Sequence, residues 1–214
     1  IPKEVDLHAG LAFLHSDGAL NAGYSTYVNS PEEVKMLPGA GKSIATLRRK
    51  GWKICIVTNQ SPIMRGLWNE QTLHEINDEL RRQLLDEDEG AHVDVILACP
   101  HRSRDRCACR KPYPGMLFLG SEIIRGGNYD NSNLIDGRGI IAINPMLRNV
   151  DWWGEKTESP HRLDLMLGDR KCDLGVAWAY GARIFRANPD IGIAGQINEM
   201  IDEGNEGVTF NPVG

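Results

Sequence analysis

The sequence predicts a doubly wound α/β domain, in which helices cover both faces of a parallel sheet. Two patterns support this prediction. Short, almost continuously apolar runs recur along the chain, as is typical of parallel strands that are buried on both faces. Amphipathic stretches separate these runs, and strands that alternate with helices indicate crossover connections. The 214 residues are enough for one full core, so we expect a single domain over 1–214.

The strands and helices follow from apolar runs and from helical spacing. The run at 52–58, WKICIVT, is the clearest buried strand, and 70–85 has apolar residues at helical spacing along one face. A second helix is expected over 34–50, where apolar residues recur before Gly51. The predicted strands are 11–14, 52–58, 93–98, 163–167 and 182–185, with 208–210 as a candidate sixth.

Composition narrows the class of protein and its partners. Apolar residues make up 41% of the chain, charged residues 25%, and the net charge is −5, as in ordinary globular proteins. A net negative charge gives no indication of nucleic-acid binding, which relies on basic side chains. No apolar run reaches the roughly 18 residues of a membrane span, and no signal-peptide pattern is visible, so no membrane partner is expected. The chain starts at Ile1 instead of methionine, which suggests a processed chain or a fragment.

Polar residues gather where the predicted strands end, and this edge of a parallel sheet is where sites form. Asp17 follows the first strand, and Thr58 closes the second. Lys111 lies after the third strand, while Asp169 and Asp173 follow the fourth. A hydroxyl, a mobile cation and several carboxylates are the groups that phosphoryl chemistry with Mg²⁺ requires. The strand ends therefore predict a phosphate site.

A separate cluster of cysteines predicts a zinc loop at 99–109. Cys99, His101, Cys107 and Cys109 give three thiolates and one imidazole, a closed tetrahedral set suited to structural zinc. Such a cluster argues against a disulfide framework. A reducing compartment follows, either the cytosol or an organelle matrix such as the mitochondrial one.

The segment 126–161 is rich in glycine, asparagine and aspartate and has no clear periodicity. A stretch of about 35 residues without regular structure is unusual inside a compact domain and tends to be functional. It contains Trp152 and Trp153, which either form the core of a folded insertion or anchor a protein partner. We expect this insertion to be a partner-binding segment.

Four motifs resemble those of the haloacid dehalogenase superfamily, in its histidinol-phosphate and heptose-bisphosphate phosphatase branch. They are F-L-H-S-D-G-A-L-N at 13–21, V-T-N-Q-S at 57–61, C-A-C-R-K-P-Y-P-G at 107–115 and G-D-R-K-C-D at 168–173. The resemblance covers 10–120 and 163–190 and implies a Rossmann-like core, catalysis through an aspartyl-phosphate, and bound Mg²⁺. The implied roles are nucleophile for position 15, acid/base for Asp17, phosphate binding for Thr58 and Lys111, substrate binding for Asn59 and Arg110, and magnesium binding for Asp169, with Asp173 beside it.

His15 departs from this pattern, because the branch has aspartate there. An imidazole cannot form an acyl-phosphate, and it is a poor ligand for Mg²⁺, which prefers oxygen ligands. The sequence therefore predicts a protein that has lost phosphatase activity and is not an enzyme, with a structural or binding role, in a larger assembly. Two alternatives stay open. One is an active Mg²⁺-dependent phosphatase on a small sugar or amino-alcohol phosphate; the other is a module that binds a phosphate-bearing molecule without hydrolysing it.

Overall fold

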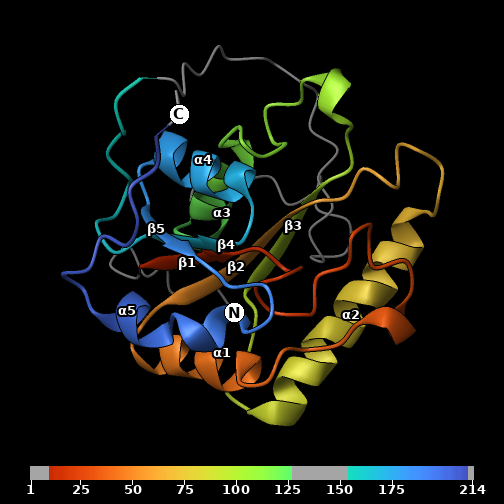
Figure 1. The fold of residues 1–214 in the computed structure, drawn as a ribbon, viewed down its shortest axis with the longest axis horizontal. Helices are drawn as coiled ribbons and strands as arrows, with labels where there is room; N and C mark the ends of the chain where they lie inside the picture. The colour runs from red at the N-terminus through yellow and green to blue at the C-terminus, as the bar shows by residue number, and fades with distance from the viewer. Residues whose placement is uncertain (1–9, 127–153, 212–214) are drawn as a thin grey trace.

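The computed structural model describes residues 10–126 and 154–211, and a five-stranded parallel sheet lies at its centre. The strand order is β3-β2-β1-β4-β5, with β1 in the middle (Figure 1). The strands are β1 (Leu11–Leu14), β2 (Lys53–Asn59), β3 (Val95–Cys99), β4 (Leu165–Gly168) and β5 (Arg183–Arg186). All five predicted strands are confirmed to within two residues at each end.

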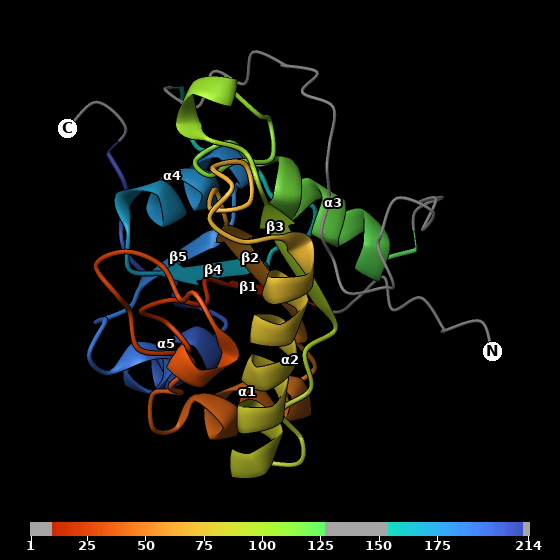
Figure 2. The same ribbon diagram turned by 90° about the vertical axis from the view of Figure 1, so that its right-hand side faces the viewer.

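Helices cover both faces of the sheet, as a doubly wound fold requires. Figures 1 and 2 show α1, α2 and α5 on one face and α3 and α4 on the other. The helices are α1 (Ala40–Arg49), α2 (Glu70–Glu87), α3 (Gly115–Ile124), α4 (Lys171–Tyr180) and α5 (Ile197–Ile201), and the 3-10 helices are η1 (Pro31–Glu33), η2 (Ser103–Asp105) and η5 (Gly192–Gly195). None of the helices in 10–126 and 154–211 is long and apolar enough to cross a membrane.

The core has two halves because alternate strand residues point to opposite faces. In β1, Ala12 and Leu14 pack under α1 and α2, while Leu11 and Phe13 pack under α3 and α4. All four side chains are fully buried, and each such leucine or phenylalanine contributes about 1.5–3 kcal/mol of transfer free energy. The central strand is therefore fixed from both sides, and with it the loop that follows it.

Two sequence predictions need correction. The helix expected over 34–50 begins only at Ala40, because Gly39 adopts a left-handed φ of 83° and interrupts the turn before it. The sixth strand at 208–210 is reduced to one bridge between Ile184 and Gly207. Gly207 has a φ of 76°, which an extended strand cannot continue through. Trp152 and Trp153 and most of the 126–161 insertion lie outside the described residues.

Candidate functional site

The loops after β1, β2 and β4 meet at the carboxyl edge of the sheet, because β2 and β4 flank β1 on either side. Backbone hydrogen bonds continue the sheet into these loops. The His15 amide donates to the carbonyl of Leu167 at 2.9 Å, and the Gln60 amide donates to the carbonyl of Cys99 at 2.7 Å. The predicted site residues from separate parts of the chain are therefore brought to one edge.

Lys111 lies at the centre of this edge, with its side chain only 1% exposed. Its Nζ donates to Asp173 Oδ1 at 2.5 Å and to the carbonyl of Val57 at 3.0 Å, and it lies 3.0 Å from His15 Nδ1. We expected a mobile cation here. An ammonium with three protons and three partners is held in place instead.

Asp173 and His15 are buried against this cation. Burial is the largest single influence on Asp173 and raises its pKa, but the charge and hydrogen bond of Lys111, together with the other groups around the carboxylate, keep that pKa below its ordinary value. Burial lowers the pKa of His15, and the Lys111 ammonium lowers it further. The site therefore holds an ion pair and a neutral imidazole. His15 Nε2 is buried and has no hydrogen-bond partner among the described residues.

Asp17 and Asp169 form the acidic part of the site. Asn21 Nδ2 donates to Asp17 Oδ1 at 2.8 Å, which orients that carboxylate. Asp169 lies against the backbone of Gly18, where a Cβ would come within 2.7 Å of Asp169 Oδ2. Gly18 also has a φ of 76°, so the turn after β1 requires glycine for its conformation and for its closeness to the carboxylate.

The hydroxyl groups come from the ends of β1 and β2. Ser16 Oγ lies 3.4 Å from Thr58 Oγ1, and Gln60 Nε2 donates to the same oxygen at 3.1 Å. The side chain of Asn59 contacts the backbone of Lys111. Its side-chain amide makes two hydrogen bonds of 3.0 Å with the backbone N–H and C=O of Lys111. Asn59 therefore positions the cation.

The carboxylates of the site fit a hard cation. Asp169 Oδ1 is buried without a partner among the described residues, and single ligand atoms of His15, Asp169 and Asp173 all lie within 4.8 Å of one another. Mg²⁺ commonly takes one or two carboxylates and keeps several waters. Asp169 could hold it, whereas Asp173 is already paired with Lys111.

The cysteine loop brings three of its four predicted ligands together. Ligand atoms of Cys99, His101 and Cys107 lie within 4.8 Å of one another and could hold a metal ion. Cys109 is buried beside them, and its backbone N–H donates to Cys107 Sγ at 3.4 Å. Hydrogen bonds from the thiols of Cys109 and Cys99 lower the pKa of Cys107 to about 2. Donating these hydrogen bonds to Cys107 raises the pKa of the Cys99 and Cys109 thiols, and burial raises it further.

A basic hollow of about 510 Å³ lies beside the site. It is lined by Met64, Arg65, Arg102, Ser103 and Arg104. Ser103 also lines a smaller cavity that reaches Lys111 and Arg110. In Figure 2 the loop after β2 and the loop that carries η2 stand next to each other above the sheet. Arg110 itself donates to the carbonyl of His101 at 2.8 Å, which ties the site to the cysteine loop.

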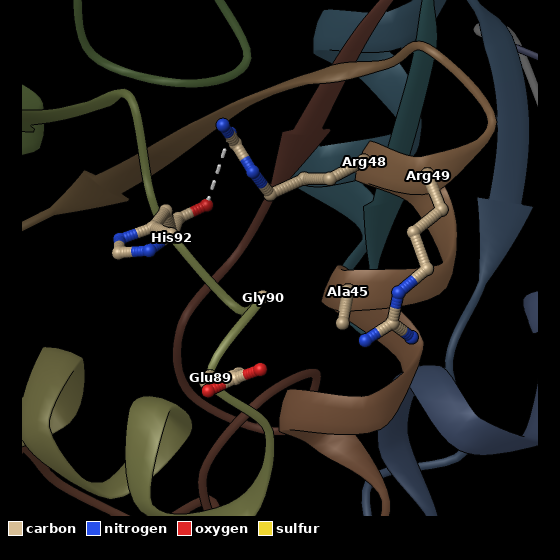
Figure 3. Close-up of a pocket in the computed structure, with 6 residues that line it drawn as sticks. All are labelled: Ala45, Arg48, Arg49, Glu89, Gly90 and His92. Carbon is tan, nitrogen blue, oxygen red and sulfur yellow. Dashed lines mark hydrogen bonds between the residues drawn. The ribbon is translucent and has the colours of Figure 1, made fainter.

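A larger hollow, of about 700 Å³, lies at the opposite edge of the sheet (Figure 3). It is lined by α1 and by the segment that precedes β3, with Arg48 bonded to the backbone carbonyl of His92. Arg48 and Arg49 are paired with Asp94 and Asp88. This hollow contains none of the predicted site residues and is not the candidate site.

Sequence reasoning missed several residues of the site. From the sequence alone, Ser16, Asn21 and Gln60 have no predicted role, although all three contribute hydrogen bonds here. A signal existed for Asn21, because a carboxylate and an amide four residues apart after a strand can pair across one turn. The contribution of Val57 is a backbone carbonyl, and side-chain identity cannot reveal it.

Comparison with known proteins identifies relatives of one kind. Over 140 residues the chain is 39% identical to the D-glycero-beta-D-manno-heptose-1,7-bisphosphate 7-phosphatase of Bordetella bronchiseptica, covering 65% of this chain and 72% of that protein. It is 39% identical over 107 residues to the Pseudomonas putida protein of the same name, of which it spans 60%. The D-glycero-alpha-D-manno-heptose-1,7-bisphosphate 7-phosphatase of Mycobacterium tuberculosis is 28% identical over 171 residues, 79% of this chain and 72% of that protein.

Solved structures agree in fold. The D,D-heptose 1,7-bisphosphate phosphatase of B. bronchiseptica, complexed with magnesium and phosphate, superposes with a TM-score of 0.61 at 30% identity, covering 87% of this chain and 86% of that one. A HAD-like phosphatase from Mesorhizobium loti gives a TM-score of 0.64 at 21% identity, covering 94% and 89%, and shows the fold alone. No protein-family profile matches the chain.

These relatives overturn one prediction from the sequence. We expected a protein that has lost phosphatase activity and is not an enzyme, on the strength of His15 alone. Relatives at 28–39% identity are named phosphatases, so the prediction was wrong. It gave one side chain more weight than the retained hydroxyls, cation and carboxylates around it. By its fold and by its likeness to the B. bronchiseptica protein, this chain belongs to the heptose-bisphosphate phosphatase family of the haloacid dehalogenase superfamily.

Proposed function

We propose that this protein is a Mg²⁺-dependent phosphatase that acts on a small phosphorylated sugar. The observation that carries the proposal is the grouping of Thr58, Lys111, Asp17 and Asp169 at one sheet edge in a chain related to named phosphatases. A phosphatase needs donors for the phosphoryl oxygens and a proton for the leaving oxygen. This edge offers both.

The described side chains divide these tasks. The hydroxyls of Ser16 and Thr58 bind the phosphoryl oxygens, and the buried ammonium of Lys111 supplies positive charge. Asp17, oriented by Asn21, gives a proton to the ester oxygen as the bond to phosphorus breaks. Overall, a water oxygen becomes bonded to phosphorus and the alcohol leaves. Bound Mg²⁺ would offset the negative charge of the phosphoryl group, with Asp169 as its ligand.

The basic hollow suggests what else the substrate carries. Arg65, Arg102 and Arg104 line it, with Arg102 paired to Asp105, and guanidinium is well matched to phosphate oxygens. The named relatives act on heptose bisphosphates. A sugar with a second phosphate could place the scissile group beside Thr58 and its other phosphate in the hollow.

The purified chain should be assayed with Mg²⁺ on both anomers of D-glycero-D-manno-heptose 1,7-bisphosphate, on the matching monophosphates and on p-nitrophenyl phosphate. We expect phosphate release, with bisphosphates preferred. Asp17→Asn should lower kcat by about 10²- to 10⁴-fold, because it removes the acid/base. His92→Gln is the matched control, since His92 is exposed at the opposite edge. Absence of release from every substrate by a folded, magnesium-loaded chain would overturn the proposal.

A further inference from the structure

We propose that His15 binds the phosphoryl group as a fixed Nε2–H donor, and that Lys111 imposes this tautomer, so that the ring is not a nucleophile. The inference rests on the proposed phosphatase function, which it deepens. It gives a role to the one side chain that the retained motifs do not explain.

All three protons of the Lys111 ammonium have acceptors. An ammonium group has three N–H donors and no acceptor. Here the three directions are taken by Asp173 Oδ1, the carbonyl of Val57 and His15 Nδ1, at 2.5, 3.0 and 3.0 Å. A neutral amine could accept a proton from Nδ1 instead. It would leave the fully buried carboxylate of Asp173 without a counter-charge, which is strongly disfavoured. Nδ1 therefore accepts, and a neutral ring carries its proton on Nε2.

His15 Nε2 is buried where no described residue offers it an acceptor. The side chain of His15 is 4% exposed, and no described residue accepts a hydrogen bond from Nε2. A buried donor without an acceptor is costly. Asp169 Oδ1 is also unpartnered among the described residues, although ligand atoms of the two side chains lie within 4.8 Å. A phosphoryl oxygen that enters at this edge would satisfy the donor.

The proton on Nε2 determines which bonds the ring can form. Once Nε2 carries a proton, its remaining electron pair belongs to the aromatic ring and cannot form a bond to phosphorus. A metal cannot bind that nitrogen either, since a metal-bound imidazole nitrogen must be unprotonated. Lys111 thus acts on the substrate through His15, because its own three protons are already donated. The Lys111 ammonium polarises the imidazole of His15, which makes Nε2–H a stronger hydrogen-bond donor to the phosphate.

The tautomer can be measured without any turnover. Long-range ¹H–¹⁵N correlation spectra of the labelled full chain would show the ring nitrogens of His15, assigned by their loss in His15→Gln. We expect a protonated Nε2 and an unprotonated Nδ1, with the Nε2–H signal moving when inorganic phosphate and Mg²⁺ are added. An Nδ1–H tautomer or a doubly protonated ring would overturn the inference.

Binding of inorganic phosphate in the presence of Mg²⁺, followed by calorimetry, tests the donor role. A lost hydrogen bond to a charged group corresponds to about tenfold or more in Kd, so His15→Ala should bind at least tenfold more weakly. His15→Gln places an amide N–H near the position of Nε2 and should stay within about threefold of the unmodified chain. His15→Asn mimics Nδ1 and should behave like His15→Ala. Equal affinity in all variants would refute the donor role.

The two proposals fail in different ways. If no substrate is hydrolysed but the tautomer and the phosphate affinities are as expected, the phosphatase proposal fails and the donor role stands. If the chain is active and an acid-labile phosphoryl group is trapped on His15, the donor role fails and the phosphatase stands. Melting temperatures of the variants would show that weaker binding does not come from unfolding.

Discussion

The phosphate site and the cysteine loop are neighbours in sequence, yet they are held together in different ways. At the phosphate site, Lys111 is surrounded by three acceptors and its charge is balanced by Asp173. In the loop, the side chains of Cys99, His101 and Cys107 converge on a point suited to a cation. The charge of Lys111 is balanced by protein groups alone, whereas the loop gathers side chains that could hold a metal ion. Since Cys109 and Lys111 are two residues apart, the metal would also support the catalytic cation.

Removing the metal from the cysteine loop should have the largest effect on stability. Structural zinc contributes on the order of 10 kcal/mol in small metal-folded peptides. A third of that would lower the Tm by about 10 °C at the 2–4 °C per kcal/mol of a domain this size. Metal analysis of protein purified without chelators should find about one zinc per chain. Cys107→Ser should lose the zinc and lower the Tm. Cys55→Ser, which changes a buried cysteine outside the loop, is the control for metal content and should keep the zinc. Full stability of the zinc-free protein would contradict a structural metal.

Breaking the ion pair should come next. Lys111→Met leaves Asp173 charged and buried, which typically costs about 3–5 kcal/mol. The double variant Lys111→Met with Asp173→Asn should recover most of that stability, because the uncompensated charge is gone. It should not recover phosphate binding. Urea unfolding of the three proteins, with phosphate titration beside it, separates the two roles of the cation. Equal loss in the single and double variants would argue against a stabilising ion pair.

The smallest of these effects should come from Asn59, which links the end of β2 to Lys111. Asn59→Ala removes two hydrogen bonds to the backbone of Lys111, each contributing about 0.5–1.5 kcal/mol. Phosphate affinity should fall with stability, whereas metal content should not change. Asn69→Ala, which removes the N-cap of α2, should cost a similar amount of stability and leave phosphate affinity unchanged. Comparing the two variants distinguishes a loss of phosphate affinity caused by misplacing Lys111 from one caused by lower overall stability.

Much of the fold could be predicted from the sequence because its strands are buried on both faces. Runs such as 52–58 have no other good interpretation, and the polar residues that follow them must meet at one edge. The helix α3 was not predicted, because it is apolar nearly all round and has no amphipathic pattern to detect. The fixed state of Lys111 was missed because it depends on the carbonyl of Val57 and on Asp173, 62 residues away.

The single bridge at Gly207 has a consequence for how the protein behaves at high concentration. The backbone of Ile184, in the outermost strand β5, donates to the carbonyl of Glu206 and accepts from the amide of Val208. An uncovered edge strand offers such groups to other chains and invites aggregation. Here the segment around Gly207 covers the edge of β5 at Ile184. A Cβ at Gly207 would come within hard contact of the Ile184 carbonyl, so glycine at this position is needed for the bridge that covers the outward backbone groups of Ile184.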